Sequence, residues 1–136
     1  MPSAARDELP EQEVVPGYSS RFADWGGITV AFEKAHAGQD VSSLLDGRCQ
    51  APHWGFLFSG RIVVDYGDRQ ETIVGGQAYY IAPDHSLAFE EDSDALEFTP
   101  TDALEQTLAA VRARASADGA ASEGPASSGA FRFQRS

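Results

Sequence analysis

Short runs of alternating apolar and polar residues, separated by turn residues, fill the middle of the sequence and restrict its fold more than any other feature. Ile28, Val30 and Phe32 alternate with smaller or polar neighbours, which is the period of a half-buried β-strand. Residues 61–76 give two strand-like runs around a turn signal at residues 66–68, a pattern typical of a β-hairpin. Further strand-like runs follow at residues 78–83, 86–91 and 95–100. So many short strands in a chain of 136 residues predict one all-β domain, a sandwich or a barrel.

The two ends of the sequence differ from this middle part. Residues 101–115 are predicted to form one C-terminal α-helix, because Asp102 can cap it and Glu105 follows three residues later, as in a capping box. The helix carries one apolar stripe made of Leu104, Leu108, Val111 and Ala115. Residues 1–20 are expected to be an irregular N-terminal arm, with a short edge strand at its end, and residues 21–100 the barrel. Residues 116–136 are small or polar and are expected to form a disordered tail.

Charge and composition exclude several classes of function. The chain has 21 acidic and 10 basic residues and a formal net charge of −11, so this acidic protein is predicted to bind neither nucleic acid nor an anionic membrane. The sequence shows no membrane-spanning or signal-peptide pattern, and we expect a cytoplasmic protein. A single cysteine rules out an intrachain disulfide and a Cys-rich zinc cluster within one chain.

The lone cysteine lies close in sequence to a histidine. In an extended chain, residues 49, 51 and 53 point to the same face, which would direct Cys49 and His53 together into the barrel with Ala51 between them. A thiol and an imidazole are both good metal ligands. The alternative is that Cys49 is a small buried apolar residue and His53 a core histidine bonded to a backbone carbonyl. The spacing alone leaves both interpretations open.

Two segments of the sequence resemble the motif blocks of the cupin superfamily. They are HWGFLFSGRIVV at residues 53–64 and GGQAYYIAPDHSL at residues 75–87. In cupins, the first block is a metal-ligating strand that ends at a glycine turn, and the second runs through a strand and a turn to a histidine. The resemblance covers roughly residues 25–100. It implies a small single-domain cupin, with a double-stranded β-helix (jelly-roll barrel) and the C-terminal helix added to it.

The candidate ligands differ from those of the usual cupin motif. Counting back from the motif's last glycine, Gly60, places His53 where the family has glutamate and Cys49 where it has the second histidine. Leu87 stands at the histidine position of the second block, and His85 lies two residues earlier. The motifs are therefore degenerate, but two ligand positions of the first block keep a metal-binding side chain of a different type.

The resemblance implies that the barrel brings both blocks together, so Cys49, His53 and His85 are predicted to hold one divalent transition metal. A thiolate with two imidazoles suits zinc, copper or iron better than magnesium or calcium. Three protein ligands would leave an open coordination position for water or a small molecule. His36, beside two alanines at the end of the first strand, is predicted to be a surface residue.

Tyr79 and Glu97 are the remaining candidates, for a small-molecule pocket. Tyr79 shares strand parity with His85, whereas Tyr80 is expected in the core or on the outer face. Glu97 lies between Leu96 and Phe98 and is expected to face solvent; the alternative is an inward carboxylate acting as base or fourth ligand. The sequence leaves three functions open: a metal-dependent enzyme, a non-catalytic binding or sensing cupin, and a structural cupin. The family resemblance also suggests a homodimer.

Overall fold

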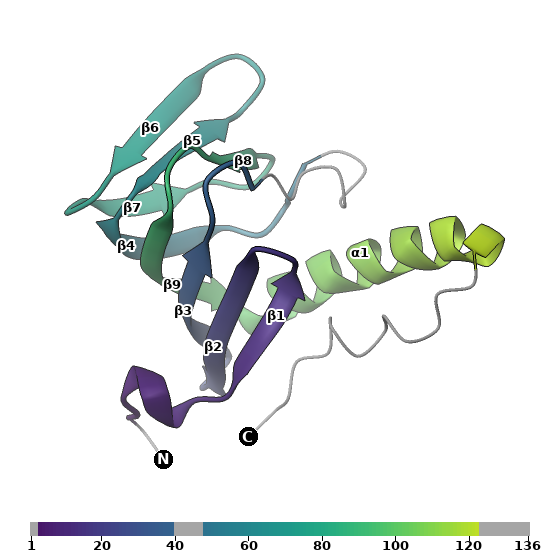
Figure 1. Cartoon of the computed structure of the whole chain (residues 1–136), viewed down its shortest axis with the longest axis horizontal. Helices are drawn as coiled ribbons and strands as arrows, with labels where there is room; N and C mark the ends of the chain where they lie inside the picture. The colour runs from purple at the N-terminus through teal and green to yellow at the C-terminus, as the bar shows by residue number, and fades with distance from the viewer. Residues whose placement is uncertain (1–2, 40–47, 123–136) are drawn as a thin grey trace.

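The computed structural model describes residues 3–39 and 48–122 and has the predicted all-β architecture with one C-terminal helix (Figure 1). Two antiparallel sheets have the strand orders β1-β2-β3-β9-β4-β7 and β6-β5-β8. The elements, in chain order, are a 3₁₀ helix (Arg6–Glu8), β1 (Glu11–Val15), β2 (Tyr18–Trp25), β3 (Ile28–Ala35), β4 (His53–Ser59), β5 (Arg61–Asp65), β6 (Gln70–Val74), β7 (Ala78–Ile81), β8 (Ser86–Phe89), β9 (Ser93–Pro100) and α1 (Thr101–Ser122).

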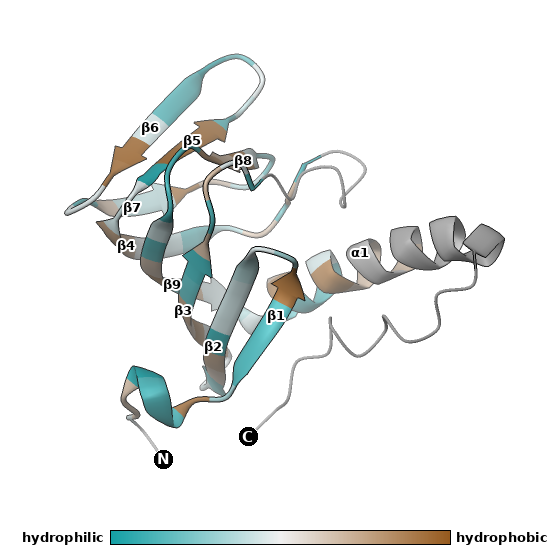
Figure 2. Ribbon diagram, in the orientation of Figure 1, coloured by the Kyte–Doolittle hydropathy of each residue, from teal (hydrophilic) through white to brown (hydrophobic). Residues whose placement is uncertain are grey.

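The apolar core is built from both sheets. Leu57 of β4, Val64 of β5 and Ile81 of β7 are almost fully buried, and Phe89 of β8 packs in the same cluster. Figure 2 shows the resulting contrast between β5, which is largely hydrophobic, and the mostly hydrophilic edge strand β1. The predicted hairpin is present as β5 and β6, whose pairing runs to Asp65 opposite Gln70. The core therefore joins the two sheets, while the edge of the larger sheet is polar.

Strands β3 and β9 of the larger sheet turn small and polar residues inward. In β3, Thr29 and Ala31 are buried, whereas Ile28 is 36% exposed. Strand β9 repeats the pattern, because Glu97 and Thr99 are buried. The exposed outer face instead carries large apolar side chains: Ile28, Trp54, Phe56, Phe58, Tyr80 and Phe98. Alternation identified these strands correctly, but the apolar half of the alternation lies on the outside of the barrel.

The two ends of the barrel differ from the prediction. Glu11–Val15 forms the edge strand β1, and β2 already begins at Tyr18, so the sheet includes much of the expected irregular arm. Pairing with β2 gives this segment the backbone hydrogen bonds that an irregular arm would have to find in water. Helix α1 continues to Ser122 instead of ending at residue 115, through a stretch in which alanine favours the helix. Residues 123–136 of the predicted tail lie outside the described residues.

Helix α1 begins against the sheet and extends away from it (Figure 1). Leu108 is only 6% exposed, as its place in the predicted stripe requires, whereas the side chains of Val111 and Ala115 lie outside the described part. The Thr101 N–H donates to the Gly27 carbonyl at 2.9 Å. The start of the helix is thus fixed to the β2–β3 turn. Within the described residues, no helix is long and apolar enough to cross a membrane.

Candidate metal centre

Cys49 and His85 face each other across an isolated β-bridge. The Cys49 N–H donates to the His85 carbonyl at 2.7 Å, and the His85 N–H donates back to the Cys49 carbonyl at 3.1 Å. Asp84, which precedes His85, adopts a left-handed conformation with φ of 70° and also donates its N–H to the Cys49 carbonyl, at 2.8 Å. This turn places the two predicted ligands side by side. Cys49 therefore precedes β4 and does not share a strand with His53. The prediction that the two residues lie on one face of the same strand was wrong on this point.

His53 enters the same place as the first residue of β4. Its imidazole is buried, and its Nδ1 lies 2.7 Å from Thr99 Oγ1 and 3.3 Å from Glu97 Oε2. Both partners point inward from β9, so they fix the ring from behind. The other nitrogen, Nε2, lies 3.8 Å from Cys49 Sγ. A histidine whose Nδ1 is held by a carboxylate while Nε2 faces other ligands has the arrangement typical of metal-binding histidines.

His85 has a buried nitrogen without a partner. The residue is 0% exposed, and its Nδ1–H donates to the Ala82 carbonyl at 2.6 Å. That bond fixes the proton on Nδ1, because a carbonyl can only accept, and leaves the lone pair of Nε2 free. No described residue hydrogen-bonds to Nε2. A buried polar atom without a partner is unfavourable by about 1–3 kcal/mol, so a native protein needs a reason to keep one.

The three side chains converge on one point. The ligand atoms of Cys49, His53 and His85 all lie within 4.8 Å of one another, and the two imidazole rings are 5.2 Å apart between centroids. One sulfur and two imidazole nitrogens form a donor set for zinc, copper or iron. The free Nε2 of His85 and the Nε2 of His53 that faces the sulfur both fit such an ion. The residues present are therefore compatible with a metal, as the sequence predicted.

In the metal-free site, the pKa values of Cys49 and His53 are shifted in opposite directions. Burial alone would raise the pKa of the Cys49 thiol, but the hydrogen bond and the positive charge of His53 lower it from 9.0 to about 6. Burial would lower the pKa of His53, but the Glu97 carboxylate and Cys49 raise it from 6.5 to about 9. Without metal, the pair is therefore a thiolate and an imidazolium at neutral pH. The same Cys49–His53–Glu97 alignment resembles an activated thiol nucleophile, so metal binding and thiol chemistry are the two reactions it can support.

Tyr79, Gly55 and Glu97 lie opposite one another on β7, β4 and β9. The Tyr79 hydroxyl donates to Glu97 Oε1 at 2.8 Å, above the backbone of Gly55. A Cβ atom at position 55 would come within 2.6 Å of the Tyr79 phenol, so this contact needs glycine. Glu97 is 8% exposed and faces inward. The expectation that it faces solvent was wrong, because Leu96 and Phe98 occupy the outer face of β9 and leave the inner face to Glu97.

A second carboxyl, Glu33 of β3, lies beside this group and was missed from the sequence. Burial, followed by the nearby Glu97 charge, raises its pKa well above the ordinary value. Glu33 also hydrogen-bonds to Tyr18 and to Glu97. Together with Tyr79, these three side chains border a cavity of about 10 Å³, which is roughly the space of one water molecule. The available signal was strand parity, because Glu33 lies on the same face of β3 as the small residues Ala31 and Ala35.

The other sequence assignments can also be placed. His36 is a surface residue as predicted, with a side chain that is 79% exposed and 3.9 Å from Asp92. Tyr80 is 52% exposed, on the outer face. Thr107 of α1, which the sequence did not suggest, lies 3.9 Å from Cys49 Sγ through its Oγ1. A contact between a helix and a loop depends on how the helix docks, and no local pattern reports that.

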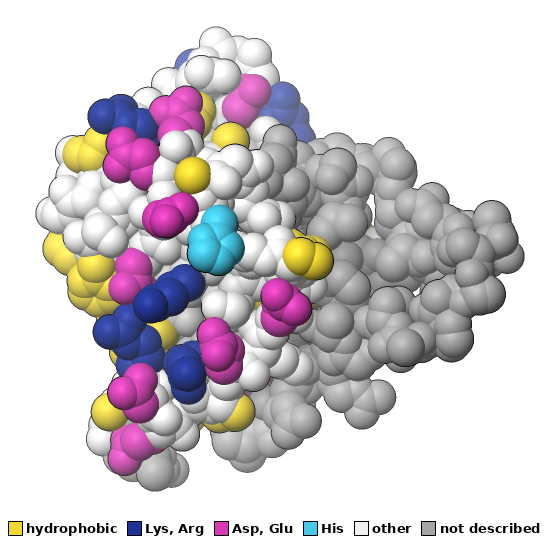
Figure 3. Space-filling model, in the orientation of Figure 1, with side chains coloured by type: hydrophobic (Ala, Val, Ile, Leu, Met, Phe, Trp, Pro, Cys, Tyr) yellow, Lys and Arg dark blue, Asp and Glu magenta, His cyan; other side chains and the backbone are white. Residues whose placement is uncertain are grey.

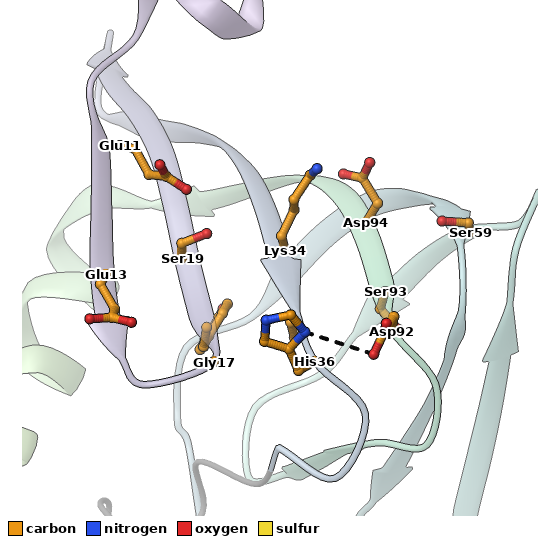
Figure 4. Close-up of a pocket in the computed structure, with 12 residues that line it drawn as sticks. Glu11, Glu13, Gly17, Ser19, Lys34, His36, Ser59, Asp92, Ser93 and Asp94 are labelled. Carbon is orange, nitrogen blue, oxygen red and sulfur yellow. Dashed lines mark ion pairs between the residues drawn. The ribbon is translucent and has the colours of Figure 1, made fainter.

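A separate groove of about 770 Å³ is lined by residues of β1, β2, β3 and β9 and by none of the three candidate ligands (Figure 4). Lys34 and His36 point into it among Glu11, Glu13 and Asp94. Figure 3 shows acidic and basic side chains mixed across this side of the molecule, in keeping with ion pairs such as Arg6–Asp94 at 3.2 Å. The groove is polar and open, and its charges are partly paired.

No known sequence family and no curated protein matches this chain. Solved structures do. An RmlC-like cupin from Shewanella frigidimarina superposes with a TM-score of 0.58 at 8% identity, over 74% of this chain and 91% of that one. Ectoine synthase from P. lautus gives 0.58 at 12% identity, over 74% and 78%. FeII HppE gives 0.55 at 11% identity, over 73% of this chain and 60% of its own length. At such identities the likeness establishes the fold alone, and it confirms the predicted cupin-type barrel.

Proposed function

We propose that this chain, which has the cupin fold, binds one divalent transition metal through Cys49, His53 and His85 and presents an open coordination position to a small molecule. The cupin fold is shared by proteins of very different activity, so the proposal rests on the site and not on the fold. Its three protein ligands are one fewer than a closed structural zinc site uses. The remaining position is the one at which water or a small organic molecule would bind.

The observation that carries the proposal is the free Nε2 of His85. The imidazole is completely buried, its Nδ1–H donates to the Ala82 carbonyl, and its Nε2 has no hydrogen-bond partner among the described residues. A histidine that merely packed in the core would be expected to satisfy both nitrogens or to be replaced by an apolar residue. A metal supplies the missing partner, and it explains why Cys49 and His53 bring their own ligand atoms to the same point.

The donor set suits zinc, copper or iron better than magnesium or calcium. FeII HppE is a cupin-fold neighbour that holds iron, which supports a transition metal in a barrel of this kind. When bound, such an ion acts as a Lewis acid or, for iron and copper, as a redox centre. The chain's own contribution is orientation: Glu97 and Thr99 hold the His53 ring, and the Ala82 carbonyl holds that of His85.

The second candidate function is a non-catalytic binding or sensing cupin. The observation that favours it is the size of the cavity beside Glu97 and Tyr79, which at about 10 Å³ takes a water but no organic substrate. Turnover of small organic substrates by the metal-loaded protein, followed by the loss of that turnover in His85→Ala, would separate an enzyme from a sensor.

We also propose a cytoplasmic homodimer. The cytoplasm would keep Cys49 reduced, as metal binding requires.

The dimer is proposed from the outer face of the larger sheet. This face exposes a row of paired aromatic side chains, in which Trp54 lies opposite Tyr80 on β7 and Phe98 on β9. These three side chains are 37–52% exposed. Monomers rarely expose so continuous an apolar surface. Analytical ultracentrifugation should give the mass of a dimer for the wild type and that of a monomer for Trp54→Glu.

The direct experiment is metal analysis of purified wild type, Cys49→Ser, His85→Ala and the control His36→Ala. Cells should be grown with zinc, copper and iron supplied, and the protein kept reduced so that oxidation of the thiol does not imitate the loss of a ligand. We expect about one metal per chain in the wild type and in His36→Ala, and none in the two ligand variants. Unchanged circular dichroism would show that the barrel persists, because its apolar core cluster contains none of the three ligand side chains. Metal-free wild type, or Cys49→Ser with full metal content, would contradict the proposal.

A further inference from the structure

Helix α1 reaches the candidate ligands from outside the barrel. Three groups lie close to the Cys49 sulfur: His53 Nε2 at 3.8 Å, Thr107 Oγ1 at 3.9 Å and the Ala51 carbonyl at 4.0 Å. His53 is a candidate ligand, and Ala51 belongs to the same loop as the cysteine. Thr107 alone of these three comes from a distant element, 58 residues along the chain. The sulfur is therefore covered on one side by a side chain that is present only while the helix is docked.

The docking of the helix has its own anchors. Thr101, its first residue, is buried and lies 3.0 Å from Thr29 of β3 through the two hydroxyl oxygens. Its N–H donates to the Gly27 carbonyl at 2.9 Å. Leu108, next to Thr107, is 6% exposed. These contacts hold the first turns of α1 in place. Thr101 before Thr107 and Leu108 after it therefore fix the position of Thr107 beside the Cys49 sulfur.

The hydroxyl of Thr107 can be satisfied in two ways. It lies 3.1 Å from the Ala103 carbonyl one turn back and donates to it. This is the usual arrangement for a threonine inside a helix, and in it the hydroxyl oxygen can only accept a hydrogen bond from a protonated Cys49. A Cys49 thiolate, whether paired with His53 or bound to a metal, only accepts hydrogen bonds. A rotation of the hydroxyl about its C–O bond allows Thr107 to donate to that thiolate, whereas a valine of the same shape has nothing to donate.

We propose that Thr107 is a positioning residue that donates a hydrogen bond to the Cys49 thiolate, so that docking of α1 and metal binding at Cys49, His53 and His85 strengthen each other. The second half of this inference rests on the proposed metal site; the contact between Thr107 and Cys49 does not. Thermodynamic linkage requires the effect to be reciprocal. A docked helix increases metal affinity, and a bound metal holds the helix more firmly by the same factor.

The experiment compares Thr107→Val with wild type, the conservative variant Thr107→Ser and the control Thr72→Val. Thr72 is exposed on β6 and is remote from the site in the fold. Metal-free proteins are titrated with cobalt(II), whose thiolate charge-transfer absorption reports the Cys49–metal bond. We expect Thr107→Val to bind about 10-fold more weakly and to shift that absorption, in line with the effect of other groups that hydrogen-bond to metal ligands. Thr107→Ser and Thr72→Val should match wild type.

Two further readouts separate this inference from the proposed function. Hydrogen exchange of the backbone amides of α1 should slow on cobalt binding in wild type and in Thr107→Ser, but less in Thr107→Val. In the metal-free proteins, the pH midpoint for alkylation of Cys49 should lie higher in Thr107→Val than in wild type. Failure of wild type to bind cobalt would overturn the metal site, and the alkylation midpoint would still judge the Thr107 contact. Equal affinity, absorption and alkylation midpoint in wild type and Thr107→Val would overturn the inference.

Discussion

Replacement of Cys49 by serine in the metal-free protein is expected to remove a pH-dependent part of its stability. In the folded protein the thiol has its pKa lowered from 9.0 to about 6, since the hydrogen bond and the charge of His53 outweigh the opposing effect of burial. The folded state therefore holds fewer protons than the unfolded state between these two values. When folding lowers the pKa of a group, the resulting stabilisation is complete above the pKa of the unfolded state and is lost as the pH falls through the pKa of the folded state. Serine does not titrate and shows none of this.

The magnitude follows from the linkage relation. Each pH unit between the two pKa values is worth about 1.4 kcal/mol for one proton. The pKa of His53 is raised to about 9, first by Glu97 and then by Cys49 and Glu33, and the two carboxylates remain in Cys49→Ser. Its own contribution therefore largely cancels in the comparison. After a reduction for the partial exposure of Cys49, wild type should gain about 2 kcal/mol over Cys49→Ser between roughly pH 6 and pH 8.

The assay is urea unfolding followed by far-UV circular dichroism at several pH values, with a chelator and a reducing agent present. Pairing of the two proteins at each pH cancels the titration of all the groups they share, Glu33 among them. The control is Ser59→Ala, on the exposed end of β4, whose free energy of unfolding should stay parallel to that of wild type. A difference between wild type and Cys49→Ser that stays constant to about 0.5 kcal/mol over this range would refute the thiolate–imidazolium pair.

Further predictions concern the surrounding residues. Leu108→Ala should lower the free energy of unfolding by about 2–4 kcal/mol in a denaturation experiment, because the side chain is 6% exposed against the sheet, and a cost near zero would mean that the helix is free. Glu33→Gln should have a higher free energy of unfolding than wild type at pH 7, and this gain should vanish near pH 4. The pKa of Glu33 is raised in the folded protein, so above its ordinary pKa of 4.5 the charged carboxylate destabilises the folded state. A difference in free energy of unfolding between the two proteins that does not change with pH would contradict this. Glu97→Gln should weaken metal binding about 10- to 100-fold in a competition titration, because it loses the carboxylate beside His53 Nδ1.

The sequence predicted the strands better than the direction their side chains take. Alternation around Ile28 and around Leu96 correctly indicated two strands, and the capping residues indicated the helix. The inward direction of Glu33 and Glu97 could not be predicted in the same way, because apolar alternation is normally interpreted as pointing into the core. In this barrel the inner polar side chains satisfy one another and His53, so the apolar residues are left for the outer face.

The candidate site was found through the family resemblance more than through local spacing. The assumption that Cys49 and His53 share a strand was incorrect, since Cys49 pairs with His85 before β4 begins. The grouping of the three side chains nevertheless holds in the structure, because the barrel topology brings the two motif blocks together. The contact of Thr107 with the sulfur depends on the docked position of a helix that follows the last strand, and no spacing in the sequence encodes that position.

Anomalous diffraction at the zinc, copper and iron absorption edges, from crystals of protein purified without chelator, tests the central claim most directly. One peak is predicted, at bonding distance from Cys49 Sγ, His53 Nε2 and His85 Nε2 at once, and the edge at which it appears identifies the metal. A map without a peak among these three atoms, or with its only peak elsewhere, such as the acidic groove around Glu11 and Glu13, would contradict the claim and leave Cys49 and His53 as packing residues.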